Sequence, residues 1–431
     1  MRRSTRFLTG LAAAILTACL LAGGGSGVAA PSAEGMERAG RSILPGAPKG
    51  AQIEPEVEEP EVDDEERERL LEQVRGLGYV TWDLRADPNL TGVTRHDAAR
   101  TAPGYNLYTD NGKKIYLMDL EGRHVRTWVI DNAGKTYTHA EILPDGRIAL
   151  LFDEHGLGTF DWNGRPIWKI EMPAHHDFTL LPGGSLMTLE HEKSPYKGRV
   201  VLFDAIVSLS AEGEVTGRWK TFDHLEEIRK HHPPSHMDQE PMPEAVPAMG
   251  VSDYYHMNSL EPLPATALGA RDRRFREGNL LVSFRNVSLI AVLDRDDLSI
   301  VWSWGPGTLE YQHMPTMLPD GHILLFDNGP FRGYSRVLEI EPASKKIVWS
   351  YESDPRDRFL SKEGGGNQRL PNGNTLICET DRGHAFEVTR GGEIVWEYWN
   401  PELVRGKRSR FYRFTRVPPG LVEPLLGVKP R

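Results

Sequence analysis

The chain has 431 residues, of which 39% are hydrophobic and 26% are charged, enough for one large core or two ordinary domains. Its formal net charge of −10 argues against nucleic acid or an anionic membrane surface as the main partner. The 43 glycines and 31 prolines recur at regular intervals, which favours many short strands joined by turns over a helical fold.

Residues 1–29 have the pattern of an export signal. Arginines near the N-terminus precede an apolar run that ends at Ala22. The sequence LTAC ending at Cys19 resembles a bacterial lipobox, which would place a lipid on Cys19. The alternatives are ordinary cleavage near Ala29 and an uncleaved anchor. All three predict an exported protein: periplasmic, held at the cell surface as a lipoprotein, or secreted.

The next two segments lead into the main domain. Residues 30–63 are rich in proline and acidic residues and predict a solvated acidic tether. Within residues 64–103, the run ERERLLEQV ending at Val74 predicts one short helix, followed by a lead-in. Membrane contact is expected only through the N-terminal lipid. Beyond the signal Cys378 is the only cysteine, so no intramolecular disulfide is expected.

From Gly104 onward the chain repeats a strand, a Leu-Pro pair and a glycine turn. The copies are ILPDGRIALLFD, LLPGGSLMTLE, PLPA followed by GNLLVSFR, MLPDGHILLFDNG and RLPNGNTLICET. Each is followed by further short strands, often with a tryptophan, as in LSIVWSW and KKIVWSY. Proline at a strand end and glycine in a turn are where those residues cost least. Four short strands at this spacing predict an all-β protein, a β-propeller whose blades bury their faces against one another.

A sixth copy lies at the C-terminus. YRFTRVPPG at 412–420 aligns with HDFTLLPGG at 176–184, yet no strand follows it. The first repeat, from 104, lacks an inner strand. We therefore predict that the C-terminal strand completes the N-terminal blade and closes a six-bladed propeller over 104–420, leaving 421–431 as a tail. An open sandwich or barrel is the alternative.

An insertion near 224–255 interrupts the repeat and is rich in His, Pro and Met. It is a candidate lid over one mouth of the propeller. Its histidines, His231, His232 and His236, lack the cysteines or helical spacing of common metal sites, so no metal is predicted.

Histidines recur where inner strands begin, ahead of the Leu-Pro pairs: His176 and His313 lie five residues before the leucine, and His256 lies seven before it. Inner strands line the channel of a propeller, so we expect the three imidazoles to meet at one mouth. Arg285, one strand after His256, could add a guanidinium. Such a set suits transfer of a tetrahedral anionic group, although a single histidine at such a place usually caps a strand.

HHDFTLLPGG, HMNSLEPL with LLVSFRN, QHMPTMLPDGHILLFDNG and QRLPNGNTLICETDRGHAFEVTRGGEIVWEY together resemble the bacterial arylsulfotransferases. That family comprises six-bladed propellers that move a sulfuryl group from a phenolic sulfate ester to another phenol without a nucleotide donor. The resemblance, over about 104–400, implies that His313 is transiently sulfated and that His256, Arg285 and His176 surround the sulfuryl group. The family's N-terminal β-domain, used for dimerisation, has no counterpart here, so the oligomeric state stays open.

The expected function is therefore nucleotide-independent sulfuryl transfer between an aryl sulfate donor and a phenolic acceptor, by a ping-pong mechanism through a sulfohistidine, with no cofactor. Side chains expected to line the aryl site are Tyr254, Tyr255, Asn258, Tyr311, Phe331 and Tyr334. The alternative is a non-catalytic propeller that binds a ligand or acts as a scaffold of the cell envelope. A quinone-dependent dehydrogenase is a weaker alternative, because such propellers usually have more blades.

Overall fold

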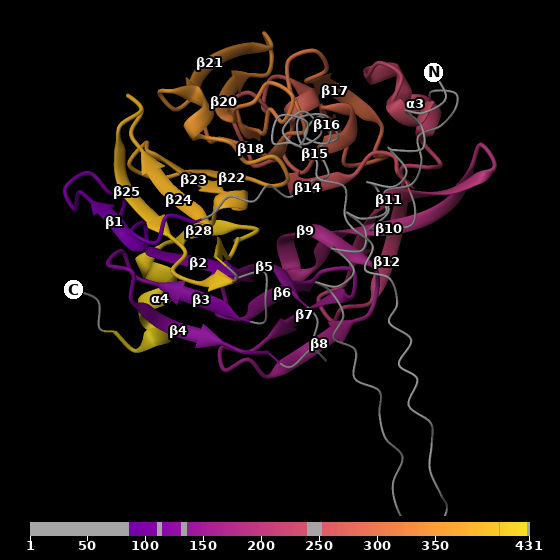
Figure 1. The fold of residues 1–431 in the computed structure, drawn as a ribbon. Helices are drawn as coiled ribbons and strands as arrows, with labels where there is room; N and C mark the ends of the chain where they lie inside the picture. Colours follow the sequence, from indigo (N-terminus) through magenta and orange to yellow (C-terminus); the bar gives the residue numbers. More distant parts are fainter. Residues whose placement is uncertain (1–85, 110–113, 131–135, 239–251, 405, 429–431) are drawn as a thin grey trace, which may run out of the picture. The chain divides into compact units, whose positions relative to one another are not determined.

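The structure is a computed structural model that describes residues 86–109, 114–130, 136–238, 252–404 and 406–428 (Figure 1). The predicted export signal with Cys19, the acidic tether and the helix ending at Val74 lie outside these residues. None of the helices in the described part of the chain has the length and hydrophobicity of a membrane span.

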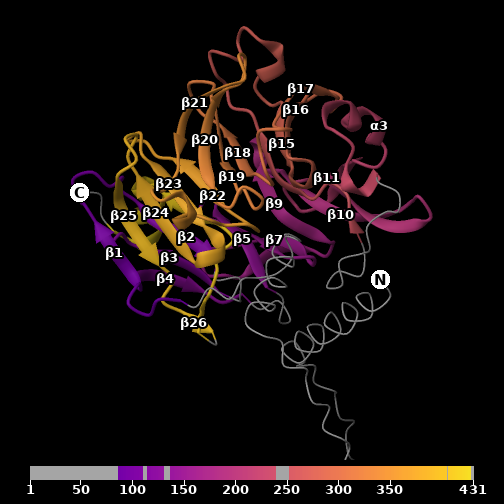
Figure 2. The same ribbon diagram turned by 45° about the horizontal axis from the view of Figure 1, so that its top comes forward.

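The strands form six antiparallel blades, each of which has its innermost strand next to the central axis (Figures 1 and 2). The first two blades are β28 (Phe414–Val417), β2 (Tyr105–Thr109), β3 (Ile115–Met118) and β4 (His124–Trp128), then β5 (Tyr137–Ile142), β6 (Ile148–Phe152), β7 (Gly156–Phe160) and β8 (Pro166–Ile170). The third and fourth are β9 (Ala174–Leu180), β10 (Leu186–Tyr196), β11 (Arg199–Leu209) and β12 (Val215–Lys220), then β14 (Met257–Pro262), β15 (Leu280–Phe284), β16 (Leu289–Leu293) and β17 (Ile300–Trp304). The fifth and sixth are β18 (His313–Met317), β19 (Ile323–Asp327), β20 (Arg336–Glu341) and β21 (Lys346–Tyr351), then β22 (Gly366–Arg369), β23 (Thr375–Glu379), β24 (His384–Val388) and β25 (Ile394–Trp399).

Hydrophobic side chains between neighbouring blades make the core. Central strands such as β6, β16 and β19 are buried along their whole length. The inner strand of one blade packs against the next blade, so that β14 contacts both β9 and β18. Each blade therefore buries its apolar faces only against its two neighbours, which is the arrangement that the repeat predicted.

The inner strand of the first blade comes from the other end of the chain. β28 pairs antiparallel with β2, with Tyr105 opposite Val417 and Tyr108 opposite Phe414. This is the pairing expected from the alignment of the sixth copy. Gln368 of β22 adds a link to the sixth blade, because its side chain accepts a hydrogen bond from the Arg416 backbone N–H at 2.7 Å and donates one to the Arg416 carbonyl at 3.0 Å.

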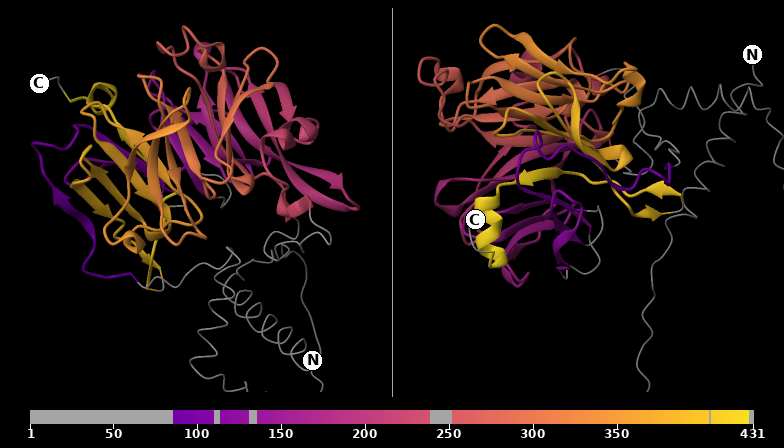
Figure 3. Two further views of the ribbon diagram at one scale, coloured as in Figure 1. Left: turned by 90° about the horizontal axis from the view of Figure 1, so that it is seen from above. Right: turned by 90° about the vertical axis from the view of Figure 1, so that its left-hand side faces the viewer.

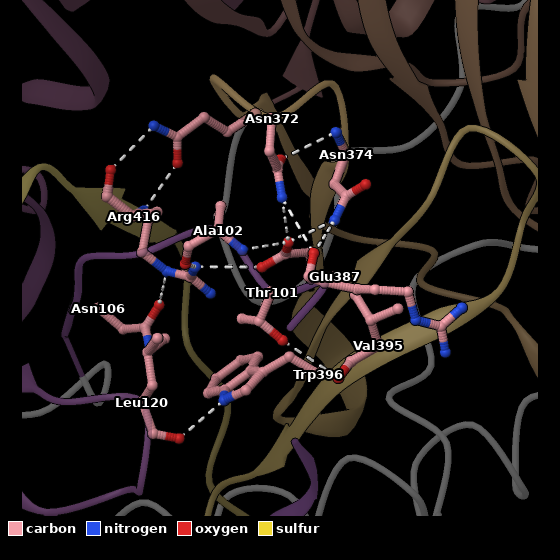
Figure 4. A network of polar contacts seen from close by, with 12 residues as sticks. Thr101, Ala102, Asn106, Leu120, Asn372, Asn374, Glu387, Val395, Trp396 and Arg416 are labelled. Atoms are coloured by element: carbon pink, nitrogen blue, oxygen red, sulfur yellow. Dashed lines mark hydrogen bonds and ion pairs between the residues drawn. The ribbon is translucent and has the colours of Figure 1, made fainter. Parts of the chain in front are cut away.

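A buried ion pair reinforces this junction (Figure 4). The Arg416 guanidinium lies 3.1 Å from the Glu387 carboxylate, and both side chains are almost completely buried. Arg416 Nε also donates to Asn106 Oδ1 at 2.8 Å, and Glu387 Oε1 accepts from Asn374 Nδ2 at 2.7 Å. The pair thus joins β28 and β2 of the first blade to β24 of the sixth.

Replacement of Glu387 by alanine is expected to cost about 3 to 5 kcal/mol of unfolding free energy, because it leaves the Arg416 guanidinium buried without its carboxylate. Urea unfolding followed by tryptophan fluorescence measures this loss. Glu393→Ala is the matched control, since Glu393 pairs with Arg100 at 2.8 Å with both side chains exposed, and it should change little. Equal unfolding midpoints for the two variants would show that the Arg416–Glu387 pair does not hold the junction.

Two elements at the ends of the described chain differ from the expectations. β1 (Gly92–His96), in the segment expected to be only a lead-in, pairs with β25 and adds a fifth strand to the sixth blade. α4 (Pro419–Leu426) occupies much of the segment expected to be a tail (Figure 3). Its Val422 is buried, and neighbouring leucines pack on the core shared by the first two blades. A proline at the first helical position suits such a start, because its missing N–H would have no partner there.

The insertion near 224–255 is described in part. It contains the short helix α3 (Leu225–Ile228) and ends in β13 (Ser252–Asp253), which pairs in parallel with β11. Its His231 Nδ1 lies 3.0 Å from Ser303 Oγ, and His232 Nδ1 lies 2.6 Å from the Pro233 carbonyl. The β13–β11 pairing and the His231–Ser303 contact tie the insertion to the third and fourth blades, and its role as a lid stays a prediction.

Candidate active site

The three histidines singled out in the sequence belong to three consecutive blades. His176 lies in β9, His256 immediately precedes β14, and His313 begins β18. His256 Nε2 lies 3.1 Å from His176 Nε2. His313 is close enough to His256 and Arg285 for their charges to lower its pKa, after the larger effect of burial. The structure thus brings the four predicted side chains to one place.

The backbone at these histidines is distorted in a way that re-aims the side chains. His176 and His256 have φ values of +58° and +52°, and Tyr311 and Met314 beside His313 have +57° and +47°. The pairing of β9, β14 and β18 with their neighbours shifts register at the same places. A left-handed non-glycine residue costs roughly 1 kcal/mol or more, and bulges commonly lie beside active sites. The shared distortion sets these positions apart from ordinary strand residues.

His313 presents an unshared electron pair. Its Nδ1 lies 2.8 Å from Asn328 Oδ1, and Asn328 Nδ2 donates to the carbonyls of Ser361 and Gly364, each at 2.8 Å. These two bonds orient the amide, so His313 Nδ1 must carry the hydrogen and Nε2 the lone pair. Nε2 is buried and has no hydrogen-bond partner among the described residues. Burial, and then Arg285, lower the pKa of His313 to about 3, which keeps the ring neutral.

Arg285 and two aromatic rings lie together beside His313. The guanidinium stands 4.3 Å from the centre of the Tyr311 ring, which meets the Phe331 ring at 5.3 Å. Arg285 Nη1 donates to Asn286 Oδ1 at 3.0 Å, whereas its Nε is buried and unpartnered within the described chain. Phe331 is 61% exposed, unusual for so large an apolar side chain. A cation and two aromatic rings near His313 suit an anion that carries an aryl group.

His256 is held by a carboxylate that sequence reasoning missed. Its Nδ1 lies 2.5 Å from Asp253 Oδ2, and its backbone N–H donates to Asp253 Oδ1 at 3.1 Å. Burial opposes ionisation of Asp253, but the charge and hydrogen bond of His256 outweigh burial and lower its pKa. An ionised carboxylate behind an imidazole orients a general acid or base. The spacing of Asp253 three residues before His256 was the only signal in the sequence.

Asn328 and Tyr412 also went unrecognised in the sequence. Asn328 follows β19 in the sequence FDNG, which reads as an ordinary turn. Tyr412 precedes β28, and its ring centre lies 5.7 Å from that of His176. Asn328 is 15 residues from His313 and reaches it from the end of the neighbouring strand β19, whereas Tyr412 comes from the C-terminal part of the chain and reaches His176 only through the arrangement of the blades.

The other residues predicted to line the aryl site have protein contacts of their own. Tyr255 is completely buried and packs against the rings of Tyr254 and Phe284. Asn258 is also completely buried and donates to the Gln312 carbonyl at 2.9 Å, which joins the fourth and fifth blades. The Tyr334 ring lies under the guanidinium of Arg332. Substrate binding by these residues stays a prediction that their described contacts do not support.

Tyr255 belongs to the packed core between the third and fourth blades, where its ring centre lies 6.5 Å from that of Phe203. It lies between β13 and β14, beside His256, whose φ of +52° departs from extended backbone. Its place next to a site histidine in the sequence therefore does not by itself bring its side chain to the site.

Comparison with known proteins gives a family. The model of a family described as arylsulfotransferase (ASST) matches residues 139–401, more than half of the chain. No curated protein matches. Among solved structures, a protein of unknown function from Bacteroides caccae is 14% identical, over 72% of this chain and 98% of that one, with a TM-score of 0.47. A streptogramin B lyase is 10% identical, over 78% of this chain and 96% of that one, with a TM-score of 0.43. With the family match covering the blades that carry His176, His256, Arg285 and His313, the chain belongs to the arylsulfotransferase family.

Proposed function

We propose that this arylsulfotransferase works by two half-reactions through a sulfated His313. The observation that carries the proposal is the buried Nε2 of His313, whose lone pair has no partner in the described part of the chain while Asn328 holds the opposite nitrogen. A neutral imidazole with a free lone pair next to a guanidinium is equipped to attack an anionic sulfate ester.

In the first half-reaction, His313 Nε2 attacks the sulfur of the donor. A nitrogen–sulfur bond forms, the bond from sulfur to the phenolic oxygen breaks, and the phenolate leaves with the electron pair. The ring becomes positively charged and keeps its hydrogen on Nδ1, where Asn328 Oδ1 accepts it. Arg285 neutralises the sulfuryl oxygens, whose charge spreads in a loose transition state like that of phosphoryl transfer.

In the second half-reaction, the oxygen of the acceptor phenol attacks the same sulfur. Its proton passes to His256 Nε2, which gives up its contact with His176, and Asp253 stabilises the resulting imidazolium. His313 leaves as the neutral ring, and the His256 proton goes to solvent or to the departed phenolate. Together the two half-reactions convert one sulfate ester into another, with no net uptake or release of protons.

The experiment is to mix the full chain with 4-nitrophenyl sulfate without an acceptor. We expect a burst of nitrophenolate close to one equivalent and a mass gain of one sulfuryl group on the peptide that contains His313. Adding phenol should remove the label and yield phenyl sulfate. If no aryl sulfate tried labels the protein, the non-catalytic binding or scaffold function replaces this proposal.

The rate of the burst should be nearly independent of pH from 8 down to 5. The neutral form of His313 is the nucleophile, and a lowered pKa means that this form persists to lower pH. With a pKa of about 3, about 99% of His313 is neutral at pH 5, against about 3% for an unperturbed histidine. Arg285→Met should move the acid limb upward, because it removes a cation that disfavours protonation. An acid limb centred between pH 6 and 7 in the wild type would contradict the assignment.

We further propose that the reaction takes place outside the cytoplasm, as the pattern of residues 1–29 suggests. The intact mass of the protein recovered from the cell envelope decides between a lipid on Cys19, cleavage near Ala29 and an uncleaved signal. A full-length protein found only in the cytoplasm would contradict export.

A further inference from the structure

A second group of titratable side chains lies directly behind the catalytic histidines and has no part in the proposed reaction. His175, His191 and Asp204 come from β9, β10 and β11 of the third blade, and all three are buried. The rings of His175 and His191 stack at 3.6 Å. One ligand atom from each residue lies within 4.8 Å of the other two.

The hydrogen bonds from the active site fix the tautomer of His175. Ionised Asp253 can only accept, so His256 Nδ1 carries a hydrogen and its Nε2 a lone pair. His176 Nε2 must therefore donate to His256 Nε2 at 3.1 Å, which leaves a lone pair on His176 Nδ1. His175 Nδ1 must then donate to His176 Nδ1 at 2.8 Å.

The pKa values favour neutral rings for the three histidines of this relay, His175, His176 and His256. Burial, and then the neighbouring histidines, lower the pKa of His175 and His176 well below 6.5. Burial also lowers the pKa of His256. A neutral His175 with its hydrogen on Nδ1 has a bare lone pair on Nε2, and that atom lies 3.3 Å from Asp204 Oδ1.

His191 approaches Asp204 from the other side of the group. His191 Nδ1 lies 2.7 Å from Glu154 Oε1 and donates to that carboxylate, while its Nε2, which must give up its hydrogen to bind a metal ion, lies 4.0 Å from Asp204 Oδ1. For His191 burial lowers the pKa, but the hydrogen bond to Glu154 and the charge of Asp204 outweigh burial and raise it to about 9. Neither Nε2 atom and neither carboxylate oxygen of Asp204 has a hydrogen-bond partner among the residues that the structure describes. Buried imidazole and carboxylate atoms that face one another without partners are costly unless a proton or a metal cation lies among them.

We propose that His175 Nε2, His191 Nε2 and Asp204 bind one divalent transition-metal ion, of which Zn²⁺ is the best match. Donors about 2.1 Å from zinc at tetrahedral angles lie about 3.4 Å apart, close to the 3.3 Å between His175 Nε2 and Asp204 Oδ1. Two imidazoles and one carboxylate favour zinc over calcium or magnesium. Glu154 behind His191 supplies the carboxylate that metal-binding histidines usually have on the opposite nitrogen.

The ion would give the third blade a positioning role in the reaction. With a metal ion on Nε2, His175 can donate a hydrogen bond only through Nδ1. His176 must then accept on Nδ1 and donate from Nε2 to His256. The lone pair that His256 offers to the acceptor phenol is thereby kept on Nε2. Metal binding itself does not depend on sulfuryl transfer, so the two proposals can fail separately.

The test uses the purified full chain, stripped with a chelator and dialysed, then titrated with Zn²⁺ in competition with a fluorescent chelator. We expect one zinc per chain, and Co²⁺ should give the intense visible absorption of a low-coordinate site. Asp204→Asn and His191→Gln should each weaken zinc binding by roughly 100-fold or more, a loss at least as large as that from an outer partner. Circular dichroism shows whether each variant is folded, and His191→Gln decides if Asp204→Asn is not.

His322→Gln is the matched control. Asp320, His322 and Glu339 form the other His-carboxylate group of suitable spacing in the described chain, but Glu339 is already 2.7 Å from Arg369. The control should bind zinc as the wild type does. Failure of the wild-type chain to bind zinc would show that a shared proton satisfies Asp204, and zinc binding unchanged in Asp204→Asn would place the ion elsewhere. Either result overturns the proposal.

Discussion

Replacement of His313 by alanine is expected to abolish both the nitrophenolate burst and the sulfuryl label, and to lower turnover by roughly 10⁶-fold, the loss seen when an enzyme loses its nucleophile. The expectation rests on position: Nε2 of His313 is the buried, unpartnered lone pair next to Arg285 in the described structure. The alanine removes the attacking atom and leaves Arg285 and Asn328 in place.

Two further variants serve as a comparison and a control for His313→Ala. His256→Ala should still be labelled by 4-nitrophenyl sulfate, because nitrophenolate leaves without a proton, but it should transfer the group to phenol far more slowly. His322→Ala changes a histidine at the start of β19 that pairs with Glu339 at 2.8 Å, and it should keep wild-type activity. Labelling that persists in His313→Ala would move the nucleophile to another residue.

Deletion of residues 411–431 is expected to leave the chain unable to fold cooperatively. The deletion removes β28 and α4, exposes the hydrogen-bonding edge of β2, and takes Val417 and Val422 out of the core. It also removes Arg413, whose guanidinium lies 3.0 Å from the buried carboxylate of Asp177. Solubility, near-ultraviolet circular dichroism and calorimetry measure the loss.

A chain that ends at Val428 is the control, because it keeps β28 and all of α4. It should melt as the full chain does. A soluble product of the longer deletion with a cooperative unfolding transition would show that the first blade is stable without its C-terminal strand.

The repeat made most of the blades predictable, because each copy of LPDG and its relatives specifies a turn whose chemistry allows few structures. The pairing of β28 with β2 was predictable because one copy lacked a following strand and another lacked a preceding one. β1 and α4 were not, since neither carries a repeat signature. β1 is only five residues long and draws its stability from β25, far away in sequence.

Part of the active site was predictable from the sequence, and part was not. The repeat positions singled out His176, His256 and His313, but their supporting residues follow no repeat. Asp253 lies in the insertion, and Asn328 follows β19 in the fifth blade. His175 was passed over as the neighbour of His176, although its side chain points into the third blade and contacts His191. Such partners are set by side-chain direction and blade packing, which a single sequence does not encode locally.

The inner strand of the first blade comes from the C-terminus, and this affects the order in which the blades are completed during synthesis. Asn106 and Arg416, which are hydrogen-bonded in the finished protein, are 310 positions apart. During synthesis β2 to β4 are made early, yet β2 must wait for its partner β28 until nearly the whole chain has been translated. Contacts of such long range form slowly, and an unpaired strand edge is prone to aggregate meanwhile. The first blade to be made is therefore the last to be completed.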